Sequence, residues 1–169
     1  MKQRTEKRKE NREPKREQNR TGNIGAVLKV IKEKRETMIT TVTLNPAIDK
    51  TITTSRLLPG QVNRGDSVKN IAGGKGINVT KVLRQYGSSV CALGFLGGYT
   101  GRFIEEYVEG LGAESAFTQI AGETRTSTNV LSMDGYVTEI LEPGPVICEE
   151  EKERFLQTYT EKLAGSRFV

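Results

Sequence analysis

The sequence predicts an α/β fold: a partial parallel sheet flanked by helices, with a small antiparallel β lid. Short apolar runs such as 38–44 and 90–96 are separated by stretches with helical periodicity. This alternation is typical of a parallel sheet that binds ligands at the carboxyl ends of its strands. Two hairpin patterns, at about 48–71 and 126–141, do not fit inside such a sheet. We therefore expect them to form a small antiparallel sheet that projects as a lid.

The first strand is expected at 38–44, where β-branched residues dominate and an Asn-Pro pair ends the run. Residues 48–54 alternate apolar and polar side chains, and a Leu-Pro-Gly turn precedes a returning strand at 62–71. A glycine turn then leads into a helix over 76–86, which Gly87 closes as a C′ glycine.

The second half of the chain continues the alternation. A buried strand at 90–96 is followed by a glycine-rich turn and a helix over 102–111. A short strand is expected at 114–120, and an Asp-Gly turn joins the two strands of the second hairpin. A helix over 148–163 begins with three glutamates, which complement the helix dipole. Residues 167–169 resemble the opening of one more strand, so we expect the sequence to be truncated at its C-terminus.

The N-terminal segment, residues 1–37, differs in composition from the rest. It holds 13 Lys/Arg against 6 Asp/Glu, whereas residues 38–169 hold 13 against 15. Residues 1–20 contain no Val, Ile, Leu or aromatic side chain and cannot bury enough apolar surface to fold. We predict a basic, disordered extension, with the folded domain beginning near Met38. An arm that binds RNA or a membrane surface is the alternative, although the acidic body gives nucleic-acid binding no electrostatic support.

The composition excludes several kinds of chemistry. The sequence has no histidine, so Ser-His-Asp and Cys-His catalysis and His-ligated zinc are excluded within it. Its two cysteines, Cys91 and Cys148, are too few for a metal site or a disulfide framework. No apolar run approaches the about 18 residues of a membrane span, and the N-terminus lacks the apolar core of a secretory signal. A cytoplasmic protein is the simplest expectation.

The stretch IAGGKGINV at 71–79 is the strongest candidate for a ligand site. Glycine lets the backbone approach a ligand closely, and a helix N-terminus presents unpaired N–H groups to an anion or to sugar oxygens. The order of its residues matches neither the Walker A loop nor the dinucleotide fingerprint. The structural alternative is a strand-to-helix turn in which the glycines serve geometry alone.

Five motifs in order resemble the N-terminal half of a PfkB-family carbohydrate kinase, which has a ribokinase-like fold. They are TLNPAID at 43–49, GGKGINV at 73–79, GFLGGYTG at 94–101, TRTSTN at 124–129 and EPGP at 142–145. Within that family the sequence is most similar to the 1-phosphofructokinases, and next to the tagatose-6-phosphate kinases. The resemblance covers residues 38–169 and implies transfer of phosphate from ATP, with Mg²⁺, to a sugar phosphate such as fructose 1-phosphate, giving fructose 1,6-bisphosphate.

The resemblance also implies which residues bind the sugar phosphate. Asp49 is expected to accept hydrogen bonds from sugar hydroxyls, and Arg125 to hold the phosphate through its guanidinium fork. The remaining implied contacts line the same site: Gly73, Gly74, Lys75 and Asn78. Each has a structural alternative: a turn cap for Asp49, charge balance for Lys75, a helix cap for Asn78 and a surface arginine beside Glu123 for Arg125.

The parts that a kinase of this family needs for catalysis are not found in the sequence. The aspartate base of a GAGD motif and the nucleotide-binding loops have no counterpart, so no catalytic residue is assigned in this chain. We therefore expect the chain to carry the sugar-binding half of such a kinase and not to be a competent enzyme alone. The alternative is an inactive remnant that binds phosphosugar or self-associates. Dimerisation through the lid is the partner interaction that the resemblance implies.

Overall fold

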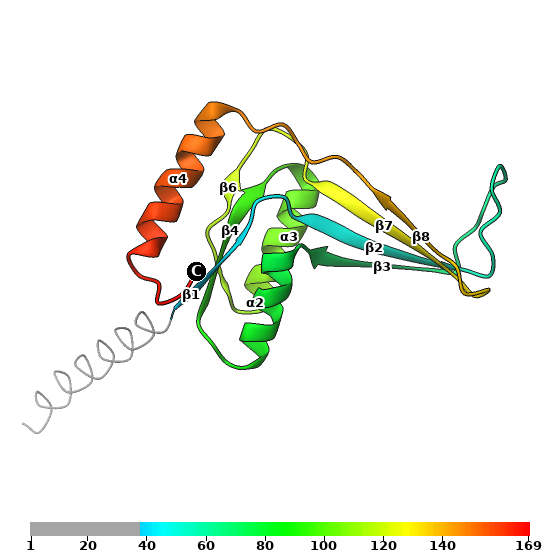
Figure 1. Cartoon of the computed structure of the whole chain (residues 1–169), viewed down its shortest axis with the longest axis horizontal. Coiled ribbons are helices and arrows are strands. Elements are labelled where there is room, and N and C mark those ends of the chain that lie inside the picture. Colours follow the sequence, from blue (N-terminus) through cyan, green and yellow to red (C-terminus); the bar gives the residue numbers. More distant parts are fainter. Residues whose placement is uncertain (1–37) are drawn as a thin grey trace, which may run out of the picture. The chain divides into compact units, whose positions relative to one another are not determined.

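The computed structural model describes residues 38–169 (Figure 1). The basic extension predicted for 1–37 lies outside the described residues. Two groups of strands organise the described part, one parallel and one mixed, and helices cover the parallel group. The predicted α/β class, with its flanking helices and its lid, is confirmed.

The parallel sheet is built on β1 (Ile39–Thr43) and β4 (Val90–Leu96), which pair from Ile39 with Val90 to Thr43 with Gly94. Every residue of β4 is buried, as its continuous apolar run predicts. On the other side of β1, Phe168 forms a single parallel bridge with Ile39. This bridge is the part of the strand predicted at 167–169 that the structure shows.

The predicted strand at 114–120 is divided in two. Its parts are β5 (Glu114–Ser115) and β6 (Thr118–Gln119), and both run parallel to β4. Between them the N–H of Ala116 donates to the carbonyl of Ala92 at 2.9 Å, while Phe117 turns into the core. The two strands are separate because the chain bends to bury that ring.

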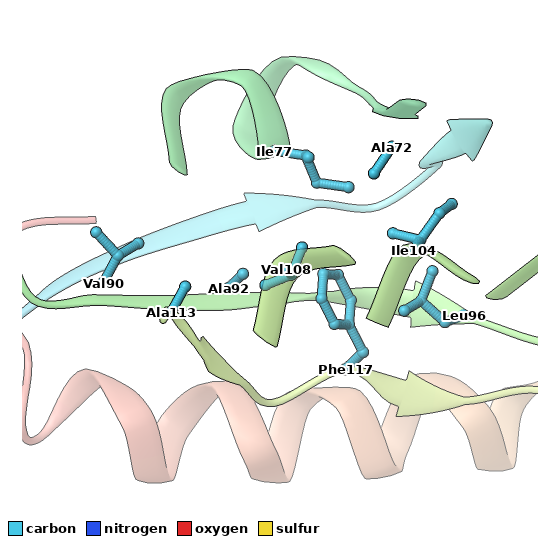
Figure 2. Packing of buried hydrophobic residues seen from close by; sticks show 9 residues of the cluster. All are labelled: Ala72, Ile77, Val90, Ala92, Leu96, Ile104, Val108, Ala113 and Phe117. Atoms are coloured by element: carbon cyan, nitrogen blue, oxygen red, sulfur yellow. The ribbon is translucent and has the colours of Figure 1, made fainter. Parts of the chain in front are cut away.

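Three helices pack on the parallel sheet: α2 (Lys75–Gln85), α3 (Gly98–Gly110) and α4 (Glu149–Leu163). Alternate residues of β4 serve opposite faces, as the period of a strand requires. On one face they pack with α2 and α3 in a cluster shown in Figure 2, made of Ala72, Ile77, Val90, Ala92, Leu96, Ile104, Val108, Ala113 and Phe117. On the other face Phe155 of α4 packs with Cys91, Leu93, Phe95 and Ile120.

The lid has four strands in the order β3 (Ser67–Gly73), β2 (Ala47–Thr54), β7 (Arg125–Ser132) and β8 (Val137–Leu141). Both hairpins are antiparallel, as predicted, but the central pair of β2 and β7 is parallel, so the lid is mixed. Figure 1 shows the reason: β2 and β7 both leave the body at the base of the lid and run outward. Two strands that start at the same edge can only pair in parallel.

Candidate functional site at the base of the lid

The candidate site lies where β2 and β3 join the body. Ile48 packs against the core, so its neighbour Asp49 projects from the opposite face of the lid, because successive side chains on a strand alternate. A Cβ atom on Gly73 would overlap the carboxylate of Asp49. The carboxylate therefore rests directly on the backbone at the end of β3, which explains why this position is a glycine.

Gly74 forms the N-cap of α2 in a conformation that glycine adopts most easily, with φ of 119°. No side chain caps this helix, and its first turn contains no acidic residue. Lys75 is its first residue and is exposed. The N-terminal N–H groups of α2 and the positive end of its dipole are thus available to oxygen atoms of a ligand.

Asn78 lies in the first turn of α2 but is not its cap. Its N–H donates to the carbonyl of Gly74 at 2.9 Å, the first bond of the helix. Its side chain is exposed, and its Oδ1 accepts a hydrogen bond from Nζ of Lys81 at 3.0 Å. The helix-cap interpretation of Asn78 is therefore not supported, and its side-chain NH₂ group remains available.

Lys81 is the residue that sequence reasoning missed. Besides Asn78, its ammonium donates to the carbonyl of Ala72, one residue before Gly73. Burial lowers the pKa of Lys81, while the negative charge of Asp49 acts in the opposite direction. The spacing of three residues between Asn78 and Lys81 on a helix is the signal that would have identified the pair.

Arg125 begins β7 and pairs with Ala47, while Ser127 pairs with Asp49. Since paired residues share a face, Arg125 and Asp49 project from the same face of the lid. Within residues 38–169 the buried Nε of Arg125 has no hydrogen-bond partner, and Nη1 reaches only the carbonyl of Glu142, at 3.4 Å. A buried guanidinium nitrogen without a partner is costly, so this group is well suited to receive a ligand.

The start of β7 is fixed by contacts with the second glycine turn. The N–H of Gly97 donates to the hydroxyl of Thr124 at 2.9 Å, and the N–H of Thr124 donates to the carbonyl of Gly97 at 3.0 Å. Glu142 accepts a hydrogen bond from the N–H of Thr126 at 2.8 Å. Thus the residues on both sides of Arg125 are held in place, Thr124 by Gly97 and Thr126 by Glu142 of the EPGP motif.

At the second glycine turn, the N-terminus of α3 is occupied by a side chain of the same protein, Glu123. The N–H of Thr100 donates to the carboxylate of Glu123 at 2.7 Å and holds the pKa of Glu123 below its ordinary value. A Cβ atom on Gly98 would overlap that carboxylate. Glu123 therefore caps α3 and is not a partner of Arg125, contrary to the surface-arginine interpretation. The cap also explains why α3 begins at Gly98, four residues before the predicted start at 102.

The start of α4 is also closed by a carboxylate, which comes from its own first turn. Glu151 accepts hydrogen bonds from the N–H groups of Ala121, at 2.8 Å, and Cys148, at 2.9 Å. Among the helices of residues 38–169, α2 alone begins without a carboxylate. This difference separates the first glycine turn from the other two helix starts.

The described residues offer neither a cluster of acidic side chains for a metal ion nor an open helix start other than that of α2. Between Met38 and Val169 no group of three or more acidic or cysteine side chains is placed to hold a cation. The starts of α3 and α4 are occupied by Glu123 and Glu151, so they do not offer a cradle for a triphosphate.

In the same part of the chain, no helix has the length and apolar character needed to cross a membrane.

Comparison with known proteins finds several that are similar to this chain. A tagatose-6-phosphate kinase of Staphylococcus epidermidis is 46% identical over 118 residues, which are 70% of this chain and 38% of that protein. A structure of a "possible 1-phosphofructokinase" from Thermotoga maritima matches with a TM-score of 0.70 and 31% identity, over 76% of this chain and 42% of that one. Phosphofructokinase-2 of Escherichia coli, in complex with fructose-6-phosphate, matches with a TM-score of 0.69 and 25% identity, over 74% and 42%.

The chain thus spans about two fifths of the length of the relatives that it matches, 38% to 42%. The family model of pfkB carbohydrate kinases matches residues 42–166, which include the glycine turn, Asp49 and Arg125. This match covers most of the described residues and the whole of the candidate site. The chain belongs to the pfkB family of carbohydrate kinases.

Proposed function

We propose that this chain carries the sugar-phosphate-binding half of an ATP-dependent kinase of the 1-phosphofructokinase type, which phosphorylates fructose 1-phosphate. The observation that carries the proposal is the meeting of Asp49, the uncapped start of α2 and Arg125 at the base of the lid. One acceptor and two kinds of donor converge there. A sugar phosphate offers the matching groups: hydroxyls that donate and a phosphate that accepts.

Each part of the site has a distinct task. The Asp49 carboxylate can only accept hydrogen bonds, so it selects a hydroxyl. Gly73 and Gly74 let the sugar approach the backbone, and Lys75 and Asn78 add donors beside the N–H groups of α2. Arg125 supplies the charge that distinguishes a phosphosugar from a plain sugar, since charge-assisted hydrogen bonds contribute about 1.5–3 kcal/mol each.

The sugar-binding half differs in its chemistry from the nucleotide half. ATP with Mg²⁺ would supply the transferred phosphoryl group, and the starts of α3 and α4 are closed to it by Glu123 and Glu151. We assign no catalytic residue in this chain. Its task in the proposal is to bind and orient the acceptor, with the lid covering the sugar.

The second candidate function is that of an inactive remnant that binds phosphosugar or pairs through its lid. The lid does expose apolar side chains on β8, where Val137, Ile140 and Leu141 are 65%, 58% and 58% exposed. We propose that two copies associate through these side chains in addition to binding sugar phosphate. The half-kinase proposal is favoured because the groups that would hold the acceptor are retained: within residues 38–169 no protein group pairs with Nε of Arg125 or caps the start of α2.

Calorimetric titration of the chain with fructose 1-phosphate, tagatose 6-phosphate and fructose tests the proposed function. We expect a phosphosugar to bind and fructose to bind far more weakly. Replacing Arg125 with alanine is expected to weaken phosphosugar binding by about 10- to 100-fold and to leave fructose unaffected. The matched control is Arg154→Ala, an exposed arginine on α4, on the other face of the parallel sheet. Equal binding of fructose and both phosphosugars would refute the proposal.

A further inference from the structure

Lys81 links two parts of the candidate site that lie apart in the sequence. Its ammonium donates to Oδ1 of Asn78 at 3.0 Å and to the carbonyl of Ala72 in β3. Asn78 belongs to the first turn of α2, and Ala72 precedes the glycine on which the Asp49 carboxylate rests. One side chain thus joins the start of the helix to the end of the strand.

The contact with Lys81 determines which end of the Asn78 amide is left for a ligand. A lysine ammonium has three donors and no acceptor, so it can meet only the oxygen of an amide. Oδ1 therefore points to Lys81, and the NH₂ group of Asn78 points away from it. Within the described part of the chain that NH₂ group donates to no other residue. Asn78 is consequently presented as a donor and not as an acceptor.

The surroundings of Lys81 differ from those of an ordinary lysine on a helix. It is half-buried, and its ammonium lies 5.3 Å from the centre of the Tyr107 ring. Burial lowers its pKa, and Asp49 opposes the shift by favouring the charged form. By contrast, Lys152 makes the same spacing of three residues with Glu149 on an exposed turn of α4. The two lysines form a natural pair for comparison.

We propose that Lys81 is a positioning residue of the sugar-phosphate site, which orients the Asn78 amide so that its NH₂ group donates to an oxygen of the sugar. The inference rests on the proposed function. Lys81 does not itself contact the sugar; it acts through Asn78 and through the attachment of α2 to β3. The site therefore requires an oxygen acceptor on the ligand at the position that Asn78 faces.

A double-mutant cycle on the full chain, with fructose 1-phosphate as the probe in calorimetry, tests this role. Lys81→Met removes all donors and is expected to weaken binding about tenfold, the size of one hydrogen bond. Asn78→Ala should lose a similar factor, and the double variant should lose no more than either single one. Lys81→Arg restores donors and should recover most of the affinity. Lys152→Met should bind as the original chain does.

Asn78→Asp separates orientation from folding. An aspartate keeps the contact with Lys81 but offers no donor, so we expect at least about a tenfold loss of binding, while the thermal midpoint should not fall, because a carboxylate in the first turn interacts favourably with the helix dipole. Nuclear magnetic resonance signals of the Asn78 NH₂ group should shift on addition of fructose 1-phosphate, and should move in unliganded Lys81→Met as well. If the role of Lys81 were purely structural, fructose 1-phosphate would still shift the signals of the Asn78 NH₂ group in Lys81→Met.

The outcomes distinguish this inference from the proposed function. If the original chain binds neither phosphosugar, the proposed function fails and the role of Lys81 fails with it. If the original chain binds but Lys81→Met binds equally well, only the positioning role is refuted. Losses that add in the double variant would also refute it, because they would mean that Lys81 acts without Asn78.

Discussion

Gly73 occupies a position where a side chain and the Asp49 carboxylate would compete for the same space. Its backbone does not need a positive φ, so the requirement is one of room and not of conformation. The glycine thereby sets how closely a ligand can approach β3 beside the carboxylate. Gly73 therefore belongs to the site because its missing side chain leaves room for the Asp49 carboxylate.

Replacing Gly73 with alanine is expected to displace the Asp49 carboxylate and to weaken binding of fructose 1-phosphate by more than about tenfold, the size of a lost charge-assisted hydrogen bond. Calorimetry provides the measurement. The matched control is Gly110→Ala at the end of α3, where an added Cβ meets nothing within 4 Å. Retained affinity in Gly73→Ala would show that the carboxylate takes no part in binding.

The residues of the site show how far a sequence can predict chemistry. Asp49, Gly73 and Gly74, which the family resemblance implied as site residues, lie together at the base of the lid, and Arg125 joins them through the parallel pairing of β2 and β7. The spacing of Asn78 and Lys81 on a helix could have indicated their contact, but the second partner of Lys81, the backbone carbonyl of Ala72, could not be predicted from the sequence. A side chain's contact with the backbone of a distant strand leaves no mark in a motif.

Helix starts are the element-scale feature that distinguishes the site from the rest of the fold. Two starts are closed by carboxylates: Glu123, which precedes β7, closes α3, and Glu151, in the first turn of α4, closes α4 itself. The start of α2 has no such group within the described residues. The sequence alone shows glycines before α2 and α3 alike; only the position of Glu123 shows that one turn is filled and the other open.

The cap of α3 predicts a pH-dependent contribution to stability. Because folding lowers the pKa of Glu123 from its ordinary value of 4.5, the carboxylate stabilises the folded chain above that pH. The contribution is lost as the pH falls below 4.5 and through the lowered pKa. At neutral pH, Glu123→Gln should lower the thermal midpoint by about 1–3 °C, from the weakened interaction with the helix dipole.

Thermal melts of the original chain and Glu123→Gln between neutral and acidic pH check this prediction. The two curves should converge as the acid protonates Glu123 in the original chain. Glu106→Gln, an exposed change in the middle of α3, serves as the control and should show no such convergence. A midpoint difference that stays constant down to low pH would contradict the assigned cap.

Element boundaries were predicted well where a local pattern defines them and less well where a distant contact does. The strand at 48–54 and the second hairpin lie close to their predicted positions, and Gly87 ends α2 as expected. The returning strand predicted at 62–71 was placed too early, because β3 begins at Ser67. The split of 114–120 depends on Phe117 reaching the core, and the parallel centre of the lid depends on where both strands leave the body. Neither dependence is local, so neither was visible in the sequence.

At the scale of the whole molecule, the lid exposes apolar side chains on its strands, among them Val137 and Leu141 of β8. We predict that Val137→Glu lowers the fraction of dimer in sedimentation velocity at a given concentration, because it places a charge beside Leu141 on the same face of β8. Val62→Glu, an exposed change in the loop between β2 and β3, is the control. A chain that is monomeric at every concentration would refute association through the lid.

In the proposed function the sugar phosphate binds at one location, the base of the lid, and a map of backbone amide shifts tests this most directly. Fructose 1-phosphate should be titrated into the labelled chain while amide resonances are followed by nuclear magnetic resonance. We predict shifts at Gly74, Lys75, Asn78 and Arg125 and none at Thr100, whose N–H is already bound to Glu123. Shifts centred on the start of α3, or none within residues 38–169, would contradict the assignment of the base of the lid as the sugar-phosphate site.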